Sequence, residues 1–109
     1  MSTYIAPLRD MQFILNEVAG LAEVCALPGN EECSVDLVES ILDEASKFAT
    51  GVLDPINRAG DTVGSVCKDG VVTTAPGFKD AYKLFCETGW NAMPFDPEFG
   101  GQGLPALVT

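Results

Sequence analysis

The chain has 109 residues, 47 % of them hydrophobic, and sixteen acidic against six basic residues give it a formal net charge of −10. This composition indicates one small globular domain rather than a disordered tail, and the excess of negative charge argues against binding to nucleic acid. Because there is no histidine, the commonest general base and metal ligand is missing, and no metal site is expected.

The N-terminal segment does not have the pattern of a signal peptide. Arg9, Asp10 and Glu17 interrupt its apolar residues, and no basic region precedes them. The sequence also has no uncharged apolar run of the roughly 18 residues that a membrane span needs. We therefore expect a cytoplasmic protein.

The first predicted element is a helix over residues 7–25. Pro7 suits a first helical turn, and apolar residues recur after it at helical spacing. The segment LPGN, which contains Pro28 and Gly29, should end this helix.

A longer second helix is predicted over residues 34–58. Ser34 is a favourable N-cap, and the apolar stripe that follows is wide enough to be covered on two sides. Pro55 should kink the helix because its ring conflicts with the carbonyl of Gly51. Gly60 should end it.

A β-hairpin and a third helix follow. Asp69 and Gly70 lie between short apolar runs and are the residues that a two-residue type I′ turn favours. A hairpin alone is marginally stable in water, so we expect it to lean on the helices or on another part of the protein. The apolar spacing then predicts a helix over residues 77–88, with Gly89 as its C-terminal stop. The predicted fold is therefore mainly α: a small domain of three to four helices with one short β-hairpin.

The aromatic and cysteine residues are interpreted as structural. We expect the aromatic residues at helical spacing to pack in the core and not to line a substrate pocket. The cysteines have no C-x-x-C spacing, and the chain has no export signal. We therefore expect them to be buried free thiols and not disulfides or zinc ligands. The residues concerned are Phe78, Tyr82, Phe85 and Trp90, and Cys25, Cys33, Cys67 and Cys86.

The most unusual segment is PFDPEFGGQGLP at residues 94–105. Its GQGLPA formally matches a variant of the dinucleotide-binding fingerprint, but Pro94 and Pro97 stand where the preceding strand should run. The glycines favour a tight, partly left-handed backbone, and Pro105 should begin another helix. We therefore predict a structural turn, and the apolar LPALVT without a stop signal is typical of a chain cut inside a larger protein.

Three stretches resemble acyl-CoA dehydrogenases. Residues 97–103, PEFGGQG, resemble the aromatic-flanked P.EYGGQG segment of the family's N-terminal domain, with Phe99 in place of the usual tyrosine. Residues 4–18 are similar to the extra N-terminal segment of a bacterial subgroup that includes 3-methylmercaptopropionyl-CoA dehydrogenases. Residues 77–90 are similar to the helix before the glycine loop in that subgroup.

The resemblance implies that residues 1–109 are the beginning of a larger α/β/α flavoenzyme. Residues 1–33 would be the subgroup's N-terminal extension, and residues 34–109 would begin the N-terminal helical domain, which packs against the remaining domains. The complete enzyme would use FAD to dehydrogenate an acyl-CoA between its α and β carbons, pass electrons to an electron-transfer flavoprotein, and form a homo-oligomer. The family's catalytic glutamate lies in the C-terminal domain, so this chain is expected to be inactive alone, with no catalytic and no FAD-binding residue.

Two roles stay open for the glycine loop. It could line the substrate cleft, or it could be a turn that locks the helical domain onto the β-domain, and we favour the second. Glu98 is interpreted as a structural or solvated carboxylate and not as a base. The alternative from another class is a small acidic helical module, without catalytic activity, that binds a partner through its apolar stripe. The loop residues concerned are Phe99, Gly100, Gly101, Gln102 and Gly103.

Overall fold

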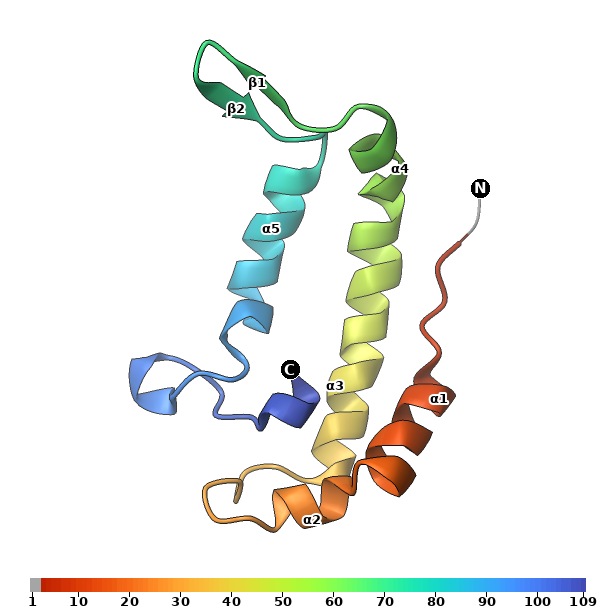
Figure 1. The fold of residues 1–109 in the computed structure, drawn as a ribbon, viewed down its shortest axis with the longest axis vertical. Coiled ribbons are helices and arrows are strands. Elements are labelled where there is room, and N and C mark those ends of the chain that lie inside the picture. Colours follow the sequence, from red (N-terminus) through yellow and green to blue (C-terminus); the bar gives the residue numbers. More distant parts are fainter. Residues whose placement is uncertain (1–2) are drawn as a thin grey trace.

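The computed structural model describes residues 3–109, and it shows helices and one hairpin arranged as a flat, open layer (Figure 1). Its extents are 51 × 36 × 18 Å, so its thickness is less than two helix diameters. The Cα radius of gyration is 16.9 Å, against about 13 Å for a compact domain of this length. The expected mainly α fold with one hairpin is confirmed, but the chain is far from compact.

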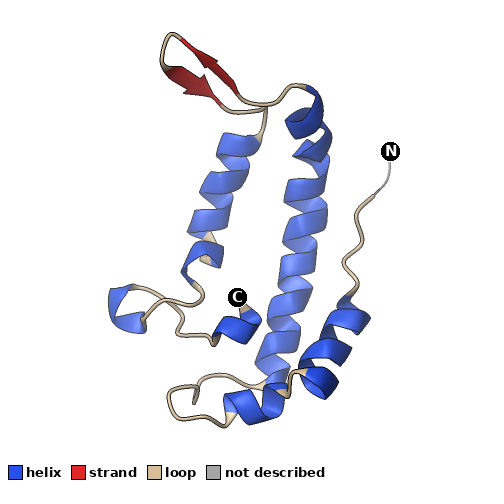
Figure 2. Cartoon of the chain, in the orientation of Figure 1, coloured by secondary structure: helices blue, strands red, loops and turns tan. Residues whose placement is uncertain are grey.

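A long helical rod forms the middle of the layer (Figure 2). It consists of α3 (Val35–Phe48), a π-helical turn (Ala49–Leu53) and α4 (Asp54–Thr62). Its start agrees with the sequence, since the Ser34 hydroxyl oxygen accepts a hydrogen bond of 3.1 Å from the Leu37 amide.

The end of the rod differs from the prediction in two ways. A π-helical turn precedes Pro55, and it widens the hydrogen-bond ladder where proline supplies no amide. The helix also runs through Gly60, so the prediction that Gly60 ends it is wrong. The stop is Gly64, whose φ of 68° lies in the left-handed region that glycine tolerates.

The N-terminal segment is not one helix over residues 7–25. It forms α1 (Leu8–Phe13), continues through a π-helical turn, and restarts as α2 (Leu21–Cys25). Gly20 separates them because its φ of 67° belongs to the left-handed region, which a continuous helix does not contain. Figure 1 shows that α2 consequently crosses the start of α3. The first two residues of the predicted extension lie outside the described part.

The hairpin is formed by β1 (Val66–Lys68) and β2 (Val71–Thr73), which pair antiparallel with Lys68 opposite Val71. Asp69 and Gly70 both have positive φ, 52° and 77°, so the predicted type I′ turn is confirmed. All residues of both strands are exposed. In Figure 1 the hairpin projects from one end of the layer and does not lean on the helices, which leaves the other expected support, another part of the protein.

Helix α5 (Phe78–Glu87) returns antiparallel to the rod (Figure 1). Its bounds agree with the prediction, with Gly77 before it and Gly89 after it, both at positive φ. The Phe85 ring lies 6.1 Å from that of Phe48 between centroids, while Tyr82 is 67 % exposed. Phe85 and Trp90 are half-buried, whereas Phe78 and Tyr82 are exposed, so the core interpretation is wrong for these two residues, because α5 is covered on one side only.

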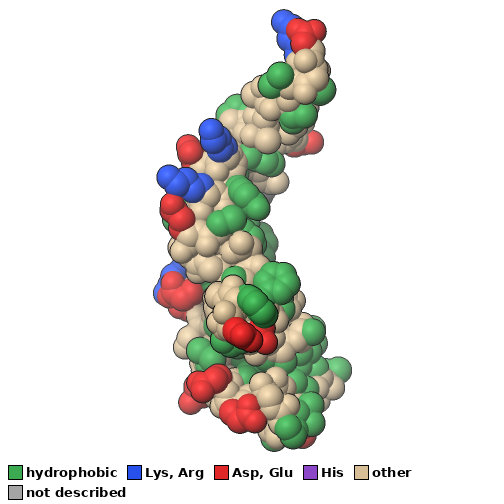
Figure 3. All heavy atoms as spheres, turned by 90° about the vertical axis from the view of Figure 1, so that its left-hand side faces the viewer, with side chains coloured by type: hydrophobic (Ala, Val, Ile, Leu, Met, Phe, Trp, Pro, Cys, Tyr) green, Lys and Arg blue, Asp and Glu red, His purple; other side chains and the backbone are tan. Residues whose placement is uncertain are grey.

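Much apolar surface stays open in this arrangement. The chain exposes 7833 Å², against about 5,800 Å² for a compact monomer of this size. Figure 3 shows hydrophobic side chains spread over one face, with charged side chains gathered along one edge. The stripe of α3 is not covered on two sides, since its only buried residue is Val38. None of the helices over residues 3–109 has the length and apolar character that spanning a bilayer requires.

Candidate functional site

The glycine loop joins the end of α5 to the C-terminal part of the chain. It contains two 3₁₀ turns, Trp90–Ala92 and Pro97–Phe99. Asp96 caps the second turn, since its carboxylate accepts a hydrogen bond of 2.8 Å from the Glu98 amide. No strand precedes the glycines within residues 90–99, which removes the structural context that a dinucleotide fingerprint requires.

The backbone amides of residues 98–104, which include the three glycines, all donate hydrogen bonds within the loop itself. Residues 100–104 form five successive hydrogen bonds of 2.9–3.1 Å to carbonyl groups, those of Pro97, Asp96, Ala92, Phe95 and Met93 in that order. A glycine-rich phosphate cradle works by pointing free amides at its ligand. These amides have no such freedom, so the loop does not have the chemistry of a phosphate site.

The three glycines serve two different physical needs. Gly100 and Gly103 have φ values of 88° and 64°, the left-handed backbone that the sequence predicts for them. Gly101 is required for another reason, because a Cβ atom at this position would overlap the backbone carbonyl of Phe95. The abundance of glycine therefore follows from a chain that folds closely back on itself.

The side chains of the loop separate into buried anchors and exposed aromatic rings. Met93 and Leu104 are buried at 8 % and 6 % exposure, whereas Phe99 is 84 % and Phe95 is 61 % exposed. Gln102 ties the loop to α5, since its Nε2 donates a hydrogen bond of 3.1 Å to the Gly89 carbonyl. Phe99 is thus an uncovered apolar ring on a rigid turn.

Glu98 lies in the second 3₁₀ turn of this loop and is exposed. Its backbone amide is the group that Asp96 holds. The exposed position agrees with the interpretation of Glu98 as a solvated carboxylate.

An apolar hollow of about 450 Å³ lies between α1, α3 and the C-terminal turn. Pro105 does not begin a full helix; it precedes a single 3₁₀ turn, Ala106–Val108, which closes one side of the hollow. The sequence alone did not indicate it, because its walls come from four separate segments of the chain, residues 11–15, 38–45, 90–93 and 107–109. The lining residues are Met11, Ile14, Leu15, Val38, Ile41, Leu42, Ala45, Trp90, Met93, Leu107, Val108 and Thr109.

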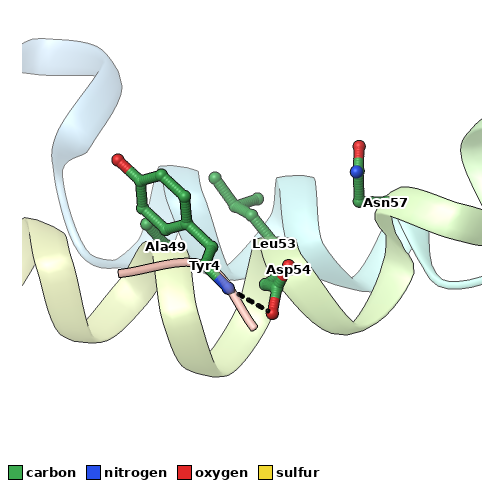
Figure 4. Close-up of a pocket in the computed structure, with 5 residues that line it drawn as sticks. All are labelled: Tyr4, Ala49, Leu53, Asp54 and Asn57. Atoms are coloured by element: carbon green, nitrogen blue, oxygen red, sulfur yellow. Dashed lines mark hydrogen bonds between the residues drawn. The ribbon is translucent and has the colours of Figure 1, made fainter. Parts of the chain in front are cut away.

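A second hollow, of about 350 Å³, lies where the extended N-terminal segment passes the π-helical turn (Figure 4). The Tyr4 amide donates a hydrogen bond of 3.1 Å to the Asp54 carboxylate, and the Thr50 hydroxyl donates one of 3.3 Å to the Tyr4 carbonyl. In Figure 4 Leu53 and Asn57 point to the same side of the rod. π-helical turns occur often at functional sites, but this one serves to hold the N-terminal segment.

The ion pairs among the described residues are exposed to solvent and do not form a reactive centre. Lys47 contacts Asp43 at 2.8 Å and Glu44 at 2.6 Å, and these hydrogen bonds, first that of Asp43, raise the pKa of the exposed Lys47. Within residues 3–109 there is no group of three side chains able to hold a metal ion.

Comparison with known proteins decides the family. No family model matches the chain. It is 34 % identical, over 106 residues and 97 % of its length, to 3-methylmercaptopropionyl-CoA dehydrogenase of Ruegeria pomeroyi. It is also 29 % identical, over its whole length, to a broad-specificity linear acyl-CoA dehydrogenase of Mycobacterium tuberculosis.

The chain belongs to the acyl-CoA dehydrogenase family. It spans about 18 % of the length of each of these two acyl-CoA dehydrogenases, and it corresponds to their N-terminal region. The resemblance to the family and to the 3-methylmercaptopropionyl-CoA dehydrogenase subgroup is confirmed. Of the loop residues singled out for this acyl-CoA dehydrogenase region, Phe99 points outward, whereas Gly101 and Gln102 are engaged with their own loop and α5.

Proposed function

We propose that this chain is the N-terminal part of an FAD-dependent acyl-CoA dehydrogenase of the cytoplasm. The complete enzyme removes two hydrogens between the α and β carbons of an acyl-CoA thioester and passes the electrons to an electron-transfer flavoprotein. The observation that carries the proposal is the 34 % identity across 97 % of the chain. The proposed substrate class, a thioether-containing or linear acyl group on coenzyme A, follows the names of the two relatives.

In this proposal residues 1–33 are the subgroup's N-terminal extension and residues 34–109 begin the helical domain. The open layer supports this role, because its exposed apolar surface suits packing against further domains. The residues present do not fit FAD: the loop amides are internally bonded, and only six basic residues occur in the whole chain. The cofactor and the base therefore belong to other parts of the enzyme.

The loop Phe99–Gly103 serves in this proposal as a domain interface and not as a wall of the substrate cleft. Phe99 is held outward by a turn whose hydrogen bonds leave it little freedom. Burying a phenylalanine ring contributes about 1.5–3 kcal/mol relative to leaving it in water. Gln102 lies apart from this contact, because its side chain is tied to Gly89.

The test uses the complete reading frame that contains this sequence. We expect a flavin-containing protein that reduces an electron acceptor when acyl-CoA is added, while the 109-residue chain alone binds no flavin and has no activity. A complete protein with no bound flavin and no activity would contradict the proposal. That result would favour the alternative, a small acidic helical interaction module. Stoichiometric flavin in the 109-residue chain would contradict the assignment of the cofactor to other parts.

Substitution of Phe99 distinguishes the two roles of the loop. If the loop is an interface, Phe99→Ser lowers the melting temperature of the complete enzyme and leaves the KM for acyl-CoA nearly unchanged. A raised KM with an unchanged melting temperature would instead make the loop part of the cleft. Phe99→Tyr, which restores the residue usual in the family, is the matched control and should change neither quantity.

A further inference from the structure

Two cysteines lie in contact at the turn between α2 and α3. The Sγ atoms of Cys25 and Cys33 are 3.0 Å apart. Cys25 ends α2 and is half-buried, and Cys33, just before the N-cap of α3, is buried. A disulfide bond is about 2.05 Å long, so the two sulfur atoms need to approach by only about 1 Å to form one.

The segment between the two cysteines is held by its own hydrogen bonds. The Asn30 side chain donates a hydrogen bond of 2.8 Å to the Val24 carbonyl, and the Cys33 amide donates one of 2.9 Å to the Asn30 carbonyl. The Gly29 amide donates to the Glu31 carboxylate at 3.0 Å and lowers the pKa of Glu31. These bonds keep the sulfur atoms together as part of the fold, and not merely because they are near in sequence.

We propose that Cys25 and Cys33 are a site of reversible oxidation, at which a small-molecule disulfide such as oxidised glutathione converts the two thiols into an intramolecular disulfide. This inference goes beyond the proposed acyl-CoA dehydrogenase function and does not depend on it. The disulfide would link the end of α2 covalently to the start of α3. Cys33 packs with Leu21 and Val38 in the small buried cluster of this region, so the link fixes the N-terminal helices on the rod.

The reaction proceeds by two exchange steps. Cys25, the more exposed thiol, attacks the small disulfide as its thiolate, forms a mixed disulfide and releases one small thiol. Cys33 then loses its proton and attacks the Cys25 sulfur, which releases the second small thiol. Two protein thiols are oxidised and one small disulfide is reduced, and the two cysteine protons end on the two released thiols. Burial raises the pKa of the Cys33 thiol to about 11, which assigns Cys33 to the second step.

The experiment measures how strongly the fold favours this bond. A Cys67→Ser/Cys86→Ser variant keeps only the proposed pair, and it is equilibrated with reduced and oxidised glutathione in native buffer and in urea. The ratio of intramolecular disulfide to dithiol gives the effective concentration of the pair. We expect it to be roughly 100-fold higher in native buffer, because in urea only the short chain separation keeps the thiols near each other.

A control variant, Cys25→Ser/Cys86→Ser, leaves Cys33 with Cys67 of the projecting hairpin. It should form mixed disulfides with glutathione and no intramolecular bond. In the unaltered chain, an endoproteinase that cuts after glutamate opens the segment at Glu31 and Glu32, and two peptides joined by a disulfide should be recovered after oxidation. Equal effective concentrations in buffer and urea, or oxidised protein whose peptides separate, would overturn the proposal.

Discussion

The ring of Phe78 rests on the backbone of Gly60, so closely that a Cβ atom at Gly60 would lie 2.6 Å from the ring's Cζ atom. Gly60 is inside α4 and not at its end. Its absent side chain is what lets α5 begin directly against the rod. The sequence predicts a helix end at Gly60, but in the fold this glycine is the position against which α5 packs.

Replacement of Gly60 by alanine should change stability differently with and without the Phe78 ring. Alanine in a helix interior is favoured over glycine by about 1 kcal/mol, and Gly60→Ala should gain this amount when Phe78→Ala has removed the ring. With Phe78 in place the ring has to move and the gain is lost. Denaturant unfolding of the four proteins in a double-mutant cycle measures the difference, which we expect to be about 1 kcal/mol or more. Additive effects would show that the contact is not maintained.

Gly101 and Gly100 should differ in their tolerance of a methyl group. Gly101→Ala places Cβ on the Phe95 carbonyl, which is backbone, and should lower the free energy of unfolding by about 3 kcal/mol. Gly100→Ala meets no atom within 4 Å and should cost only the left-handed strain, about 1–2 kcal/mol. Thermal unfolding of both variants tests which one loses more stability. A larger loss of stability for Gly100→Ala would mean that backbone strain, and not crowding, limits substitutions in the loop.

Stability should fall in alkaline solution because of Cys33. Its pKa is raised from the ordinary value of 9.0 to about 11 by burial, with a contribution from Cys25. Between these values the unfolded chain has lost the proton and the folded chain retains it, so the free energy of unfolding decreases by at most about 1.4 kcal/mol per pH unit. The stabilisation is complete below pH 9.0 and is lost as the pH approaches 11.

Cys33→Ala is the control for this pH dependence. It removes the titrating group and leaves every other ionisable side chain in place. Urea unfolding under reducing conditions at several pH values should show a shallower decline for the alanine variant. Identical slopes would remove Cys33 as the cause.

The 109-residue chain alone should associate with itself. Its exposed apolar surface has no partner in the open layer, and symmetric pairing is a common way to cover such a surface. The net charge of −10 opposes association, so salt should strengthen it by screening the repulsion. Sedimentation at low and high salt measures this, and a monomer under both conditions would indicate a self-sufficient domain.

Features that depend on neighbours in sequence could be predicted. The Asp69-Gly70 turn, the Ser34 cap and the bounds of α5 each follow from the conformational preference or hydrogen bond of one or two residues. The break at Gly20 was not predicted because the apolar spacing continues across it. The neighbouring residues do not indicate that this glycine adopts a positive φ.

The relationships that the sequence did not reveal are those between distant segments. The contact of Gly60 with Phe78 and the closeness of Gly101 to the Phe95 carbonyl exist only after the chain has folded back. The same holds for the Cys25 and Cys33 sulfur atoms, which lack a C-x-x-C spacing. For the candidate loop, the need for glycine could be predicted from the sequence, but the outward position of Phe99 could not.

The π-helical turn sets the rotational phase of the rod. Seven positions separate Ile41 from Phe48, which is close to two α-helical turns, but eight separate Phe48 from Ile56. In an unbroken α-helix the extra residue would rotate Ile56 by about 100° away from the Phe48 side. The turn Ala49–Leu53 absorbs this residue.

The rod consequently presents one continuous seam to α5 and the glycine loop. Ile41 lies near Trp90, Phe48 packs on Phe85, and Ile56 lies against Gly77. An insertion or deletion of one residue between Ile41 and Phe48 would break this seam, because nothing there takes up the rotation. Within the π-helical turn, by contrast, the loss of a single residue would convert the wide turn to an ordinary α-helical one and leave Ile56 seven positions from Phe48, so the seam would be kept.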